Sequence, residues 1–274
     1  MKSKIGATTL CYAGFSLDDA LRGIAKAGIK YVEPSAMHES CGAHSELTEH
    51  IIPEKMTKQD LESLKYKFKD YGLQPMSISG HANLVVKESV EALKSRINLA
   101  KEIGAEIVNT KVGDPSSEEE VNMFYNNIAQ IAYFASQNNV IVGLETSGSY
   151  FNTAQKAAPI LKKINSPFIR LNYDTANVIY YAGVRPEEDI EYGIEFIAHI
   201  HLKDKIGGKG EFNFPYLGKG NIDFKKIFTI LQRNRFEGPL SIEVEFDGKR
   251  KETLDDVDYA VKKSFEFLKN ILNI

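Results

Sequence analysis

The sequence has few cysteines, no long apolar run and no excess of basic residues. Its two cysteines, Cys11 and Cys41, show no CxxC spacing, and two thiols in 274 residues are more typical of buried side chains than of a disulfide framework. No segment approaches the roughly 20 apolar residues of a membrane span. The opening residues, Met-Lys-Ser-Lys-Ile, lack the apolar core of a signal peptide. We therefore expect a cytoplasmic protein that contacts no membrane.

The charge balance and the missing nucleotide motifs weigh against further classes of protein. A net charge of -3 and a pI near 6.1 give no overall attraction to nucleic acid or to anionic lipid. No strand-like segment is followed by the Gly-rich fingerprint of a dinucleotide-binding sheet, and there is no Walker loop. The hydrophobic fraction of 43% is that of an ordinary globular protein, so a sizeable core can form.

The chain does contain a regular alternation of short apolar segments and longer segments with helical periodicity. Predicted strands cover residues 4–10, 29–33, 73–79, 106–110, 140–145, 168–174, 198–203 and 239–245. Predicted helices cover residues 17–27, 57–71, 88–103, 117–137, 153–164, 187–196, 223–233 and 254–272. This alternation predicts a parallel sheet with right-handed crossovers. Eight repeats in a chain near the usual length of about 250 residues favour one domain, residues 1–274, folded as a (β/α)8 TIM barrel.

One stretch departs from the alternation. Residues 34–56 carry three histidines and little apolar periodicity, which predicts a long surface loop. We expect His38, His44 and His50 to be surface residues within it.

The predicted strands have one apolar face and one polar face. In residues 140–145, Val142 and Leu144 share a face and Glu145 lies on the other. The same alternation gives five other segments a face that carries polar side chains. In chain order these faces hold Glu33; Ser77, Ser79 and His81; Arg170, Asn172 and Asp174; Ile197, His199, His201 and Lys203; and Ser241, Glu243 and Glu245. In a barrel the apolar faces meet the surrounding helices, so these polar sets are predicted to point inward.

Four successive strands thereby direct Glu145, Asp174, His201 and Glu243 toward their carboxyl ends, where barrels of this kind place active sites. Three carboxylates buried together need a compensating cation, which predicts a divalent metal site. Oxygen-rich ligation favours Mn²⁺, and Mg²⁺, Co²⁺ or Zn²⁺ also suit the set. Glu245 shares the face of Glu243 and stays an alternative fourth ligand.

Several motifs carry a resemblance that covers most of the chain. They are Leu-Glu145-Thr, Tyr-Asp174-Thr-Ala-Asn177, His-Ile-His201-Leu-Lys203-Asp204, Gly218-Lys-Gly220-Asn-Ile-Asp223 and Leu-Ser-Ile-Glu243-Val-Glu. Together they resemble the xylose-isomerase-like sugar phosphate isomerase/epimerase superfamily. Its ketose 3-epimerases bind Mn²⁺ or Co²⁺ through Glu, Asp, His and Glu, which implies ligation by Glu145, Asp174, His201 and Glu243. The two glutamates of that family move the proton, so the resemblance implies acid/base roles for Glu145 and Glu243. Asn177 occupies the position, three residues after Asp174, at which the epimerases usually carry a histidine.

We therefore expect a divalent-metal-dependent sugar or sugar phosphate isomerase/epimerase that transfers a proton through a metal-stabilised enediolate. A lyase or dehydratase acting on keto-sugars, inositol derivatives or C-glycosides would use the same machinery. An endonuclease of the AP-site type is disfavoured by the acidic pI and by only six histidines. A non-catalytic binding protein is the weakest alternative, because all four proposed ligands are present.

The predicted substrate contacts are polar residues near the proposed ligands. They are Glu33, His81, Lys111, Asn177 and Lys203. His199 lies further back in its strand, where a structural hydrogen bond is expected. We expect a small carbohydrate as the partner and no nucleic acid; a homo-oligomer stays open.

Overall fold

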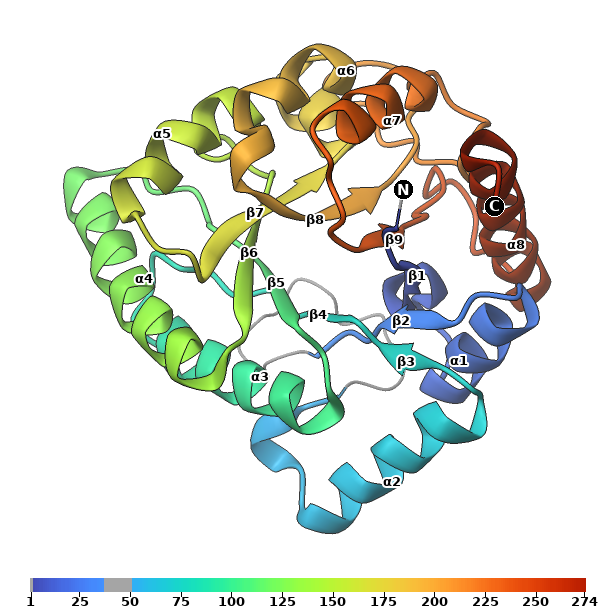
Figure 1. Cartoon of the computed structure of the whole chain (residues 1–274), viewed down its shortest axis with the longest axis horizontal. Coiled ribbons are helices and arrows are strands. Elements are labelled where there is room, and N and C mark those ends of the chain that lie inside the picture. Colours follow the sequence, from blue (N-terminus) through green and yellow to red (C-terminus); the bar gives the residue numbers. More distant parts are fainter. Residues whose placement is uncertain (1, 37–50) are drawn as a thin grey trace.

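The computed structural model describes residues 2–36 and 51–274, and within them nine strands form one parallel sheet (Figure 1). The order is β3-β2-β1-β9-β8-β7-β6-β5-β4. The strands are β1 (Ile5–Thr8), β2 (Tyr31–Glu33), β3 (Gln74–Pro75), β4 (Ser77–Ser79), β5 (Ile107–Lys111), β6 (Ile141–Glu145), β7 (Ile169–Asp174), β8 (Ile197–Leu202) and β9 (Leu240–Ile242).

Strands β3 and β4 are two parts of one extended segment interrupted at Met76. Because β3 pairs with β2 and β4 pairs with β5, this segment joins the two ends of the sheet. The Met76 amide donates to the Val32 carbonyl and its own carbonyl accepts from the Glu106 amide, so the ladder continues on both sides. The sheet is therefore a ring of eight extended segments, as the sequence predicts for a TIM barrel.

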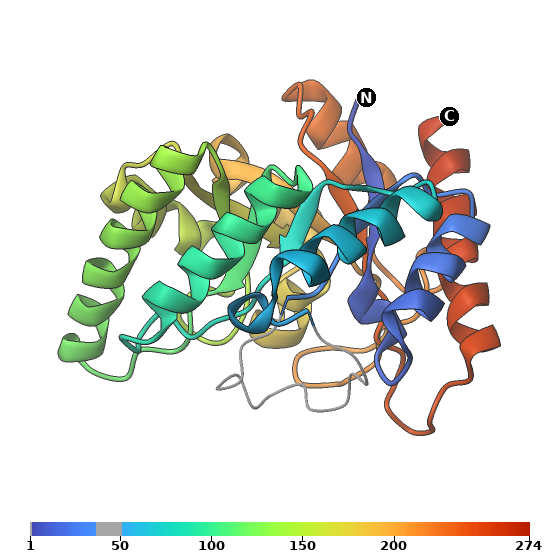
Figure 2. The same ribbon diagram turned by 90° about the horizontal axis from the view of Figure 1, so that it is seen from below.

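The helices surround this ring (Figures 1 and 2). They are α1 (Leu17–Lys26), α2 (Lys58–Asp70), α3 (Ser89–Ile103), α4 (Glu118–Asn138), α5 (Ala154–Ile164), α6 (Pro186–Asp189), α7 (Phe224–Arg233) and α8 (Leu254–Leu272). Capping boxes begin α1, α2 and α8, where a Ser or Thr hydroxyl accepts from the amide of an Asp whose side chain accepts in return.

Some predicted boundaries are wrong. The first strand ends at Thr8 because the Thr8 hydroxyl accepts from the Leu10 amide and starts a 3₁₀ turn, Thr9–Tyr12. The last strand ends at Ile242, and the predicted helix 187–196 is α6 followed by a 3₁₀ segment, Ile190–Phe196. A π-helical turn, Val178–Ala182, was not predicted.

The predicted loop 34–56 is described only at its ends. Ala36 pairs with Ile51, and Pro53–Lys55 forms a 3₁₀ turn. Cys41, His38, His44 and His50 lie outside the described residues. Cys11 is buried and forms no disulfide within the part of the chain that the structure describes.

The predicted alternation of faces is confirmed in the barrel wall. Apolar side chains such as Val142, Leu144 and Ile200 belong to the hydrophobic core that the helices cover. Ile197 is an exception, because a register shift pairs Ile197 with Leu171 and His199 with Asn172. Ile197 accordingly joins the apolar core and does not share the face of His199.

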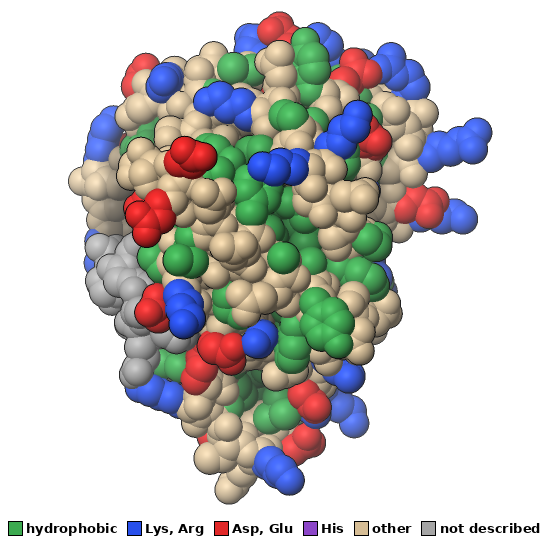
Figure 3. All heavy atoms as spheres, turned by 90° about the vertical axis from the view of Figure 1, so that its left-hand side faces the viewer, with side chains coloured by type: hydrophobic (Ala, Val, Ile, Leu, Met, Phe, Trp, Pro, Cys, Tyr) green, Lys and Arg blue, Asp and Glu red, His purple; other side chains and the backbone are tan. Residues whose placement is uncertain are grey.

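Among the described helices, none combines the length and apolar character that crossing a bilayer requires. On the side of the molecule that carries α4, acidic and basic side chains are interspersed and form no large patch of one sign among the described residues (Figure 3).

Candidate metal centre and active site

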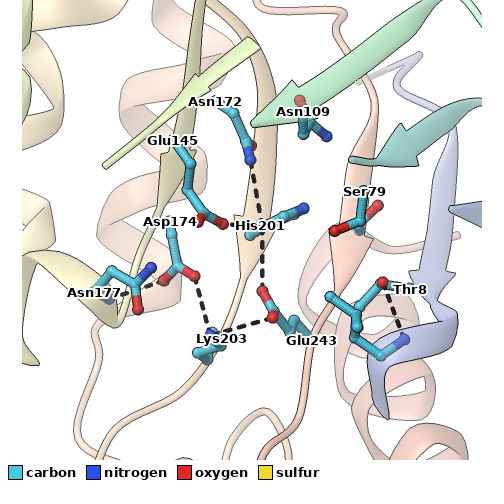
Figure 4. Close-up of polar contacts among 12 residues, drawn as sticks. Thr8, Ser79, Asn109, Glu145, Asn172, Asp174, Asn177, His201, Lys203 and Glu243 are labelled. Atoms are coloured by element: carbon cyan, nitrogen blue, oxygen red, sulfur yellow. Dashed lines mark hydrogen bonds and ion pairs between the residues drawn. The ribbon is translucent and has the colours of Figure 1, made fainter. Parts of the chain in front are cut away.

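Four predicted ligands meet at the carboxyl ends of adjacent strands. Glu145 ends β6, Asp174 ends β7, His201 lies near the end of β8, and Glu243 follows β9 (Figure 4). One ligand atom from each lies within 4.8 Å of the other three. No member of this group is more than 3% exposed. We call these four residues the donor group.

His201 lies at the centre of the donor group. Its Nδ1 is 2.7 Å from Glu145 Oε1 and 3.1 Å from Glu243 Oε2. Its Nε2, on the opposite side of the ring, is 3.0 Å from Glu33 Oε1. Burial lowers the pKa of His201, but the surrounding carboxylates outweigh it and hold that pKa well above its ordinary value.

Asp174 and Glu243 each keep an oxygen that suits a cation. Asp174 Oδ1 accepts from the amides of Ala176 and Asn177, both at 2.8 Å. Asp174 Oδ2 and Glu243 Oε2 are buried, and neither accepts a hydrogen bond from a described residue. Each has an ion-pair partner, Lys203 Nζ at 3.3 Å from Asp174 Oδ2 and His201 Nδ1 at 3.1 Å from Glu243 Oε2. Buried carboxylate oxygens without hydrogen bonds suit a cation as a further partner. Three carboxylates and one imidazole nitrogen, with these two oxygens free of hydrogen bonds, fit a divalent metal ion.

The protonation states of the acids differ. Burial raises the pKa of Asp174 to about 7, although the Lys203 ammonium opposes this effect. Burial also acts to raise the pKa of Glu145, but the neighbouring imidazoles of His81 and His201 and a hydrogen bond from His201 lower it to about 2. Glu145 is therefore ionised at neutral pH, as a proton acceptor must be.

Lys203 is nearly fully buried among the carboxylates. Its Nζ lies 3.3 Å from Asp174 Oδ2, 3.3 Å from Glu243 Oε1 and 3.0 Å from Glu245 Oε2. Nζ also lies 5.2 Å from the centre of the Phe214 ring. With these partners the ammonium balances the charge of the acids. The Glu245 side chain is 33% exposed and falls outside the donor group, so Glu243 is the fourth member.

Glu33 lies on the other side of His201 from the remaining acids and is 0% exposed. Its Oε1 accepts from Asn109 Nδ2 at 3.0 Å, and its Oε2 accepts from the Ser241 hydroxyl. Oε2 is also 3.1 Å from His199 Nε2. Glu33, His199 and His201 form a second group with ligand atoms within 4.8 Å, but both oxygens of Glu33 already hold these hydrogen bonds.

The structural role predicted for His199 is confirmed. Its Nδ1 is 2.8 Å from Asn172 Oδ1, and its Nε2 is 3.1 Å from Ser77 Oγ. The sequence analysis placed Asn172 and Ser241 on inward faces without assigning them a role. It did not name Asn109, which strand alternation could have placed beside these groups.

Three further predicted residues border the donor group. His81 is 8% exposed, and burial together with the charge of Lys111 lowers its pKa to about 3, so it is neutral at neutral pH. Asn177 is 6% exposed and holds Asp174 through its backbone amide. Lys111 ends β5, is partly exposed, and acts electrostatically on Glu145 and His81.

The structure is a parallel (β/α)8 barrel, and a group of three carboxylates and one imidazole is buried at its carboxyl end. The protein therefore falls in the class of α/β barrels with a candidate metal centre. Residues 21–271 match the family model described as the xylose isomerase-like TIM barrel, and the chain belongs to that family.

Similar proteins include an inosose dehydratase of Clostridium botulinum (strain Alaska E43 / Type E3), 27% identical over 65% of this chain and 66% of that protein. A ketose 3-epimerase of Arthrobacter globiformis is 24% identical over 67% of this chain and 68% of that protein. The chain thus spans about two thirds of the length of these relatives. A xylose isomerase domain protein from Planctomyces limnophilus has the same fold, with a TM-score of 0.77 and 20% identity over 100% of this chain and 99% of that one.

Proposed function

We propose that the protein is a divalent-metal-dependent isomerase or epimerase of sugars or sugar phosphates. The observation that carries this proposal is the donor group, in which Glu145 and Glu243 approach His201 Nδ1 from two different strands. Two buried glutamates from separate walls of one site can serve opposite faces of a substrate carbon. The similarity to a ketose 3-epimerase supports this reaction class.

We propose Mn²⁺ as the metal held by Glu145, Asp174, His201 and Glu243. A bound divalent cation supplies Lewis acidity that makes the hydrogen beside a substrate carbonyl more acidic. The buried oxygens of Asp174 and Glu243 that accept no hydrogen bond support this assignment, and the oxygen-rich set favours Mn²⁺.

In the proposed reaction Glu145 takes a proton from the carbon beside the carbonyl, because its carboxyl group is ionised at neutral pH. Glu243, in its protonated form, returns a proton to that carbon from the opposite face in epimerisation, or to the neighbouring carbon in isomerisation. Glu145 then loses its proton to solvent and Glu243 takes one from solvent, which completes the cycle. Lys203 balances the charge of Asp174 and Glu243 through its two ion pairs. We assign Lys203 to charge balance because its ammonium already faces three carboxylates.

We propose that Lys111, His81 and Asn177 bind substrate hydroxyls. All three border the donor group, and the neutral His81 ring offers both a donor and an acceptor. The full occupation of both Glu33 oxygens argues against the substrate contact predicted for Glu33.

The test is proton exchange with solvent. Chelator-treated protein is supplied with Mn²⁺, Mg²⁺, Co²⁺ or Zn²⁺ and incubated in D₂O with free and phosphorylated ketoses, and NMR follows deuterium entering at carbon. We expect deuterium in an epimer or an isomer, with the highest rate in Mn²⁺. Absence of exchange with every sugar and metal would contradict the proposal.

A metal-dependent dehydratase is the second candidate, favoured by the similarity to inosose dehydratase. The same proton abstraction by Glu145 would then be followed by loss of a hydroxyl group from the next carbon. Incubation with an inosose separates the two reactions. Release of water, with formation of a conjugated carbonyl and no deuterated epimer, would assign the dehydratase.

A further inference from the structure

Glu33 contacts the donor group through His201 alone. Its side chain comes from β2, across the barrel from β6 and β7, and has no exposed surface. A residue so enclosed cannot touch a substrate without rearrangement of the barrel interior. Its partners, however, fix its charge and orientation.

The carboxylate of Glu33 is held so that it can only accept hydrogen bonds. Asn109 Nδ2 donates to Oε1, and the Ser241 hydroxyl donates to Oε2. Because Asn109 Nδ2 can only donate, Oε1 acts as an acceptor. Oε1 also lies 3.0 Å from His201 Nε2 and is positioned to accept a proton carried by that nitrogen.

Asn172 contacts both histidines. Its Oδ1 lies 2.8 Å from His199 Nδ1. Its Nδ2, which can only donate, lies 3.3 Å from His201 Nδ1. When His201 Nδ1 binds a cation, the one proton of the ring is on Nε2, where Glu33 Oε1 accepts it.

We propose that Glu33 is a positioning residue, whose carboxylate holds the proton of His201 on Nε2 and keeps the Nδ1 lone pair directed at the proposed cation position among Glu145, Asp174 and Glu243. This inference rests on the proposed metal-dependent function and extends it. Metal-bound imidazoles are generally oriented by such an acceptor on their second nitrogen, and loss of the acceptor weakens metal binding by 10- to 100-fold.

The first experiment compares Mn²⁺ binding by the full chain and its Glu33→Gln variant, using calorimetry on chelator-treated protein. We expect the dissociation constant to rise by about 10- to 100-fold, because a neutral amide loses the charge that holds the proton on Nε2. The matched control is Ser77→Ala, which removes a contact to His199 in the same interior but leaves Glu33 and His201 together. We expect its dissociation constant to stay within about twofold of the native value.

The second experiment needs no Glu33 variant. Nitrogen-15 NMR of Mg²⁺-loaded native protein reports which ring nitrogen of His201 carries the proton, with His201→Gln used to assign the signals. We expect a single form protonated on Nε2. A proton on Nδ1, or unchanged Mn²⁺ affinity in a folded Glu33→Gln variant, would overturn the inference. A native protein that binds Mn²⁺ but exchanges no ketose proton would defeat the proposed function alone.

Discussion

Glu145 and Glu243 approach the same imidazole nitrogen but have different neighbours. Glu145 is 2.7 Å from His201 Nδ1, and its charge is further stabilised by Lys111. Glu243 is shared between His201 and the Lys203 ammonium. Glu145 therefore faces fewer fixed positive charges within contact distance and is the better placed of the two to accept the first proton.

Replacing Glu145 by Gln removes this proton acceptor with little change in shape. We expect Glu145→Gln to lower the rate of deuterium exchange by at least about 10²- to 10⁴-fold while the thermal unfolding curve stays cooperative. Glu106→Gln is the control, because Glu106 is exposed and pairs with Lys4 at the edge of the sheet. Native exchange rates in Glu145→Gln would rule out its acid/base role.

Cys11 offers a prediction about pH. Burial raises the pKa of its thiol to about 12, so the reactive thiolate is scarce at pH 8 and becomes more abundant as the pH rises. At pH 8 the thiolate fraction is about 10⁻⁴, compared with roughly a quarter for an ordinary cysteine. In a Cys41→Ser background we expect iodoacetamide to label native protein at least about 100-fold more slowly than urea-unfolded protein. Similar rates in both states would contradict the buried environment.

Alternation along the strands was enough to predict that Glu145, Asp174, His201 and Glu243 face inward, because side-chain direction in a strand is a local property. The depth of a side chain along the barrel axis is not a local property. It depends on the register between neighbouring strands, which the sequence does not reveal. For this reason alternation alone did not predict that Glu33 is enclosed between His199 and His201.

At the scale of elements, α1 and α8 pack against each other where the first and last units of the barrel meet. Tyr12 Oη donates to Asp258 Oδ1 at 3.0 Å, and Gly23 of α1 leaves room for this pair. A Cβ atom at position 23 would overlap both Tyr12 Oη and Asp258 Oδ1.

This close approach predicts that Gly23→Ala destabilises the protein. Alanine favours an isolated helix over glycine by about 1 kcal/mol, but overpacking costs about 1 to 3 kcal/mol, so we expect a net loss in urea unfolding. Tyr12→Phe removes Oη, the nearest of the overlapping atoms. The double variant should therefore lose less stability than the sum of the two single variants, and simple additivity would argue against the clash.

Element types were predicted better than element ends. Apolar periodicity identifies α3, α4 and α8 because each spans several turns. The end of β1 depends on one hydroxyl, Thr8 Oγ1, which captures a backbone amide. The turn Val178–Ala182 is too short to show a period, so no pattern in the sequence distinguished it.

At the scale of the whole molecule, the donor group joins four strands, β6 to β9. A cation held there stabilises the folded chain relative to the unfolded chain, by about 2.7 kcal/mol at 100 times its dissociation constant. We expect Mn²⁺ to raise the thermal midpoint and EDTA to reverse the rise, measured by circular dichroism. Asp174→Asn, which removes one donor, should lose most of this shift. Equal midpoints with Mn²⁺ and EDTA would contradict a specific site.

The distribution of the donor group along the chain also bears on how the protein matures. The four donors come from β6, β7, β8 and the residue that follows β9, so ribosomal synthesis adds Glu243 last of the four. A nascent chain that has not yet reached Glu243 therefore lacks one donor. We expect such a chain to bind the cation more weakly than a chain that includes all four.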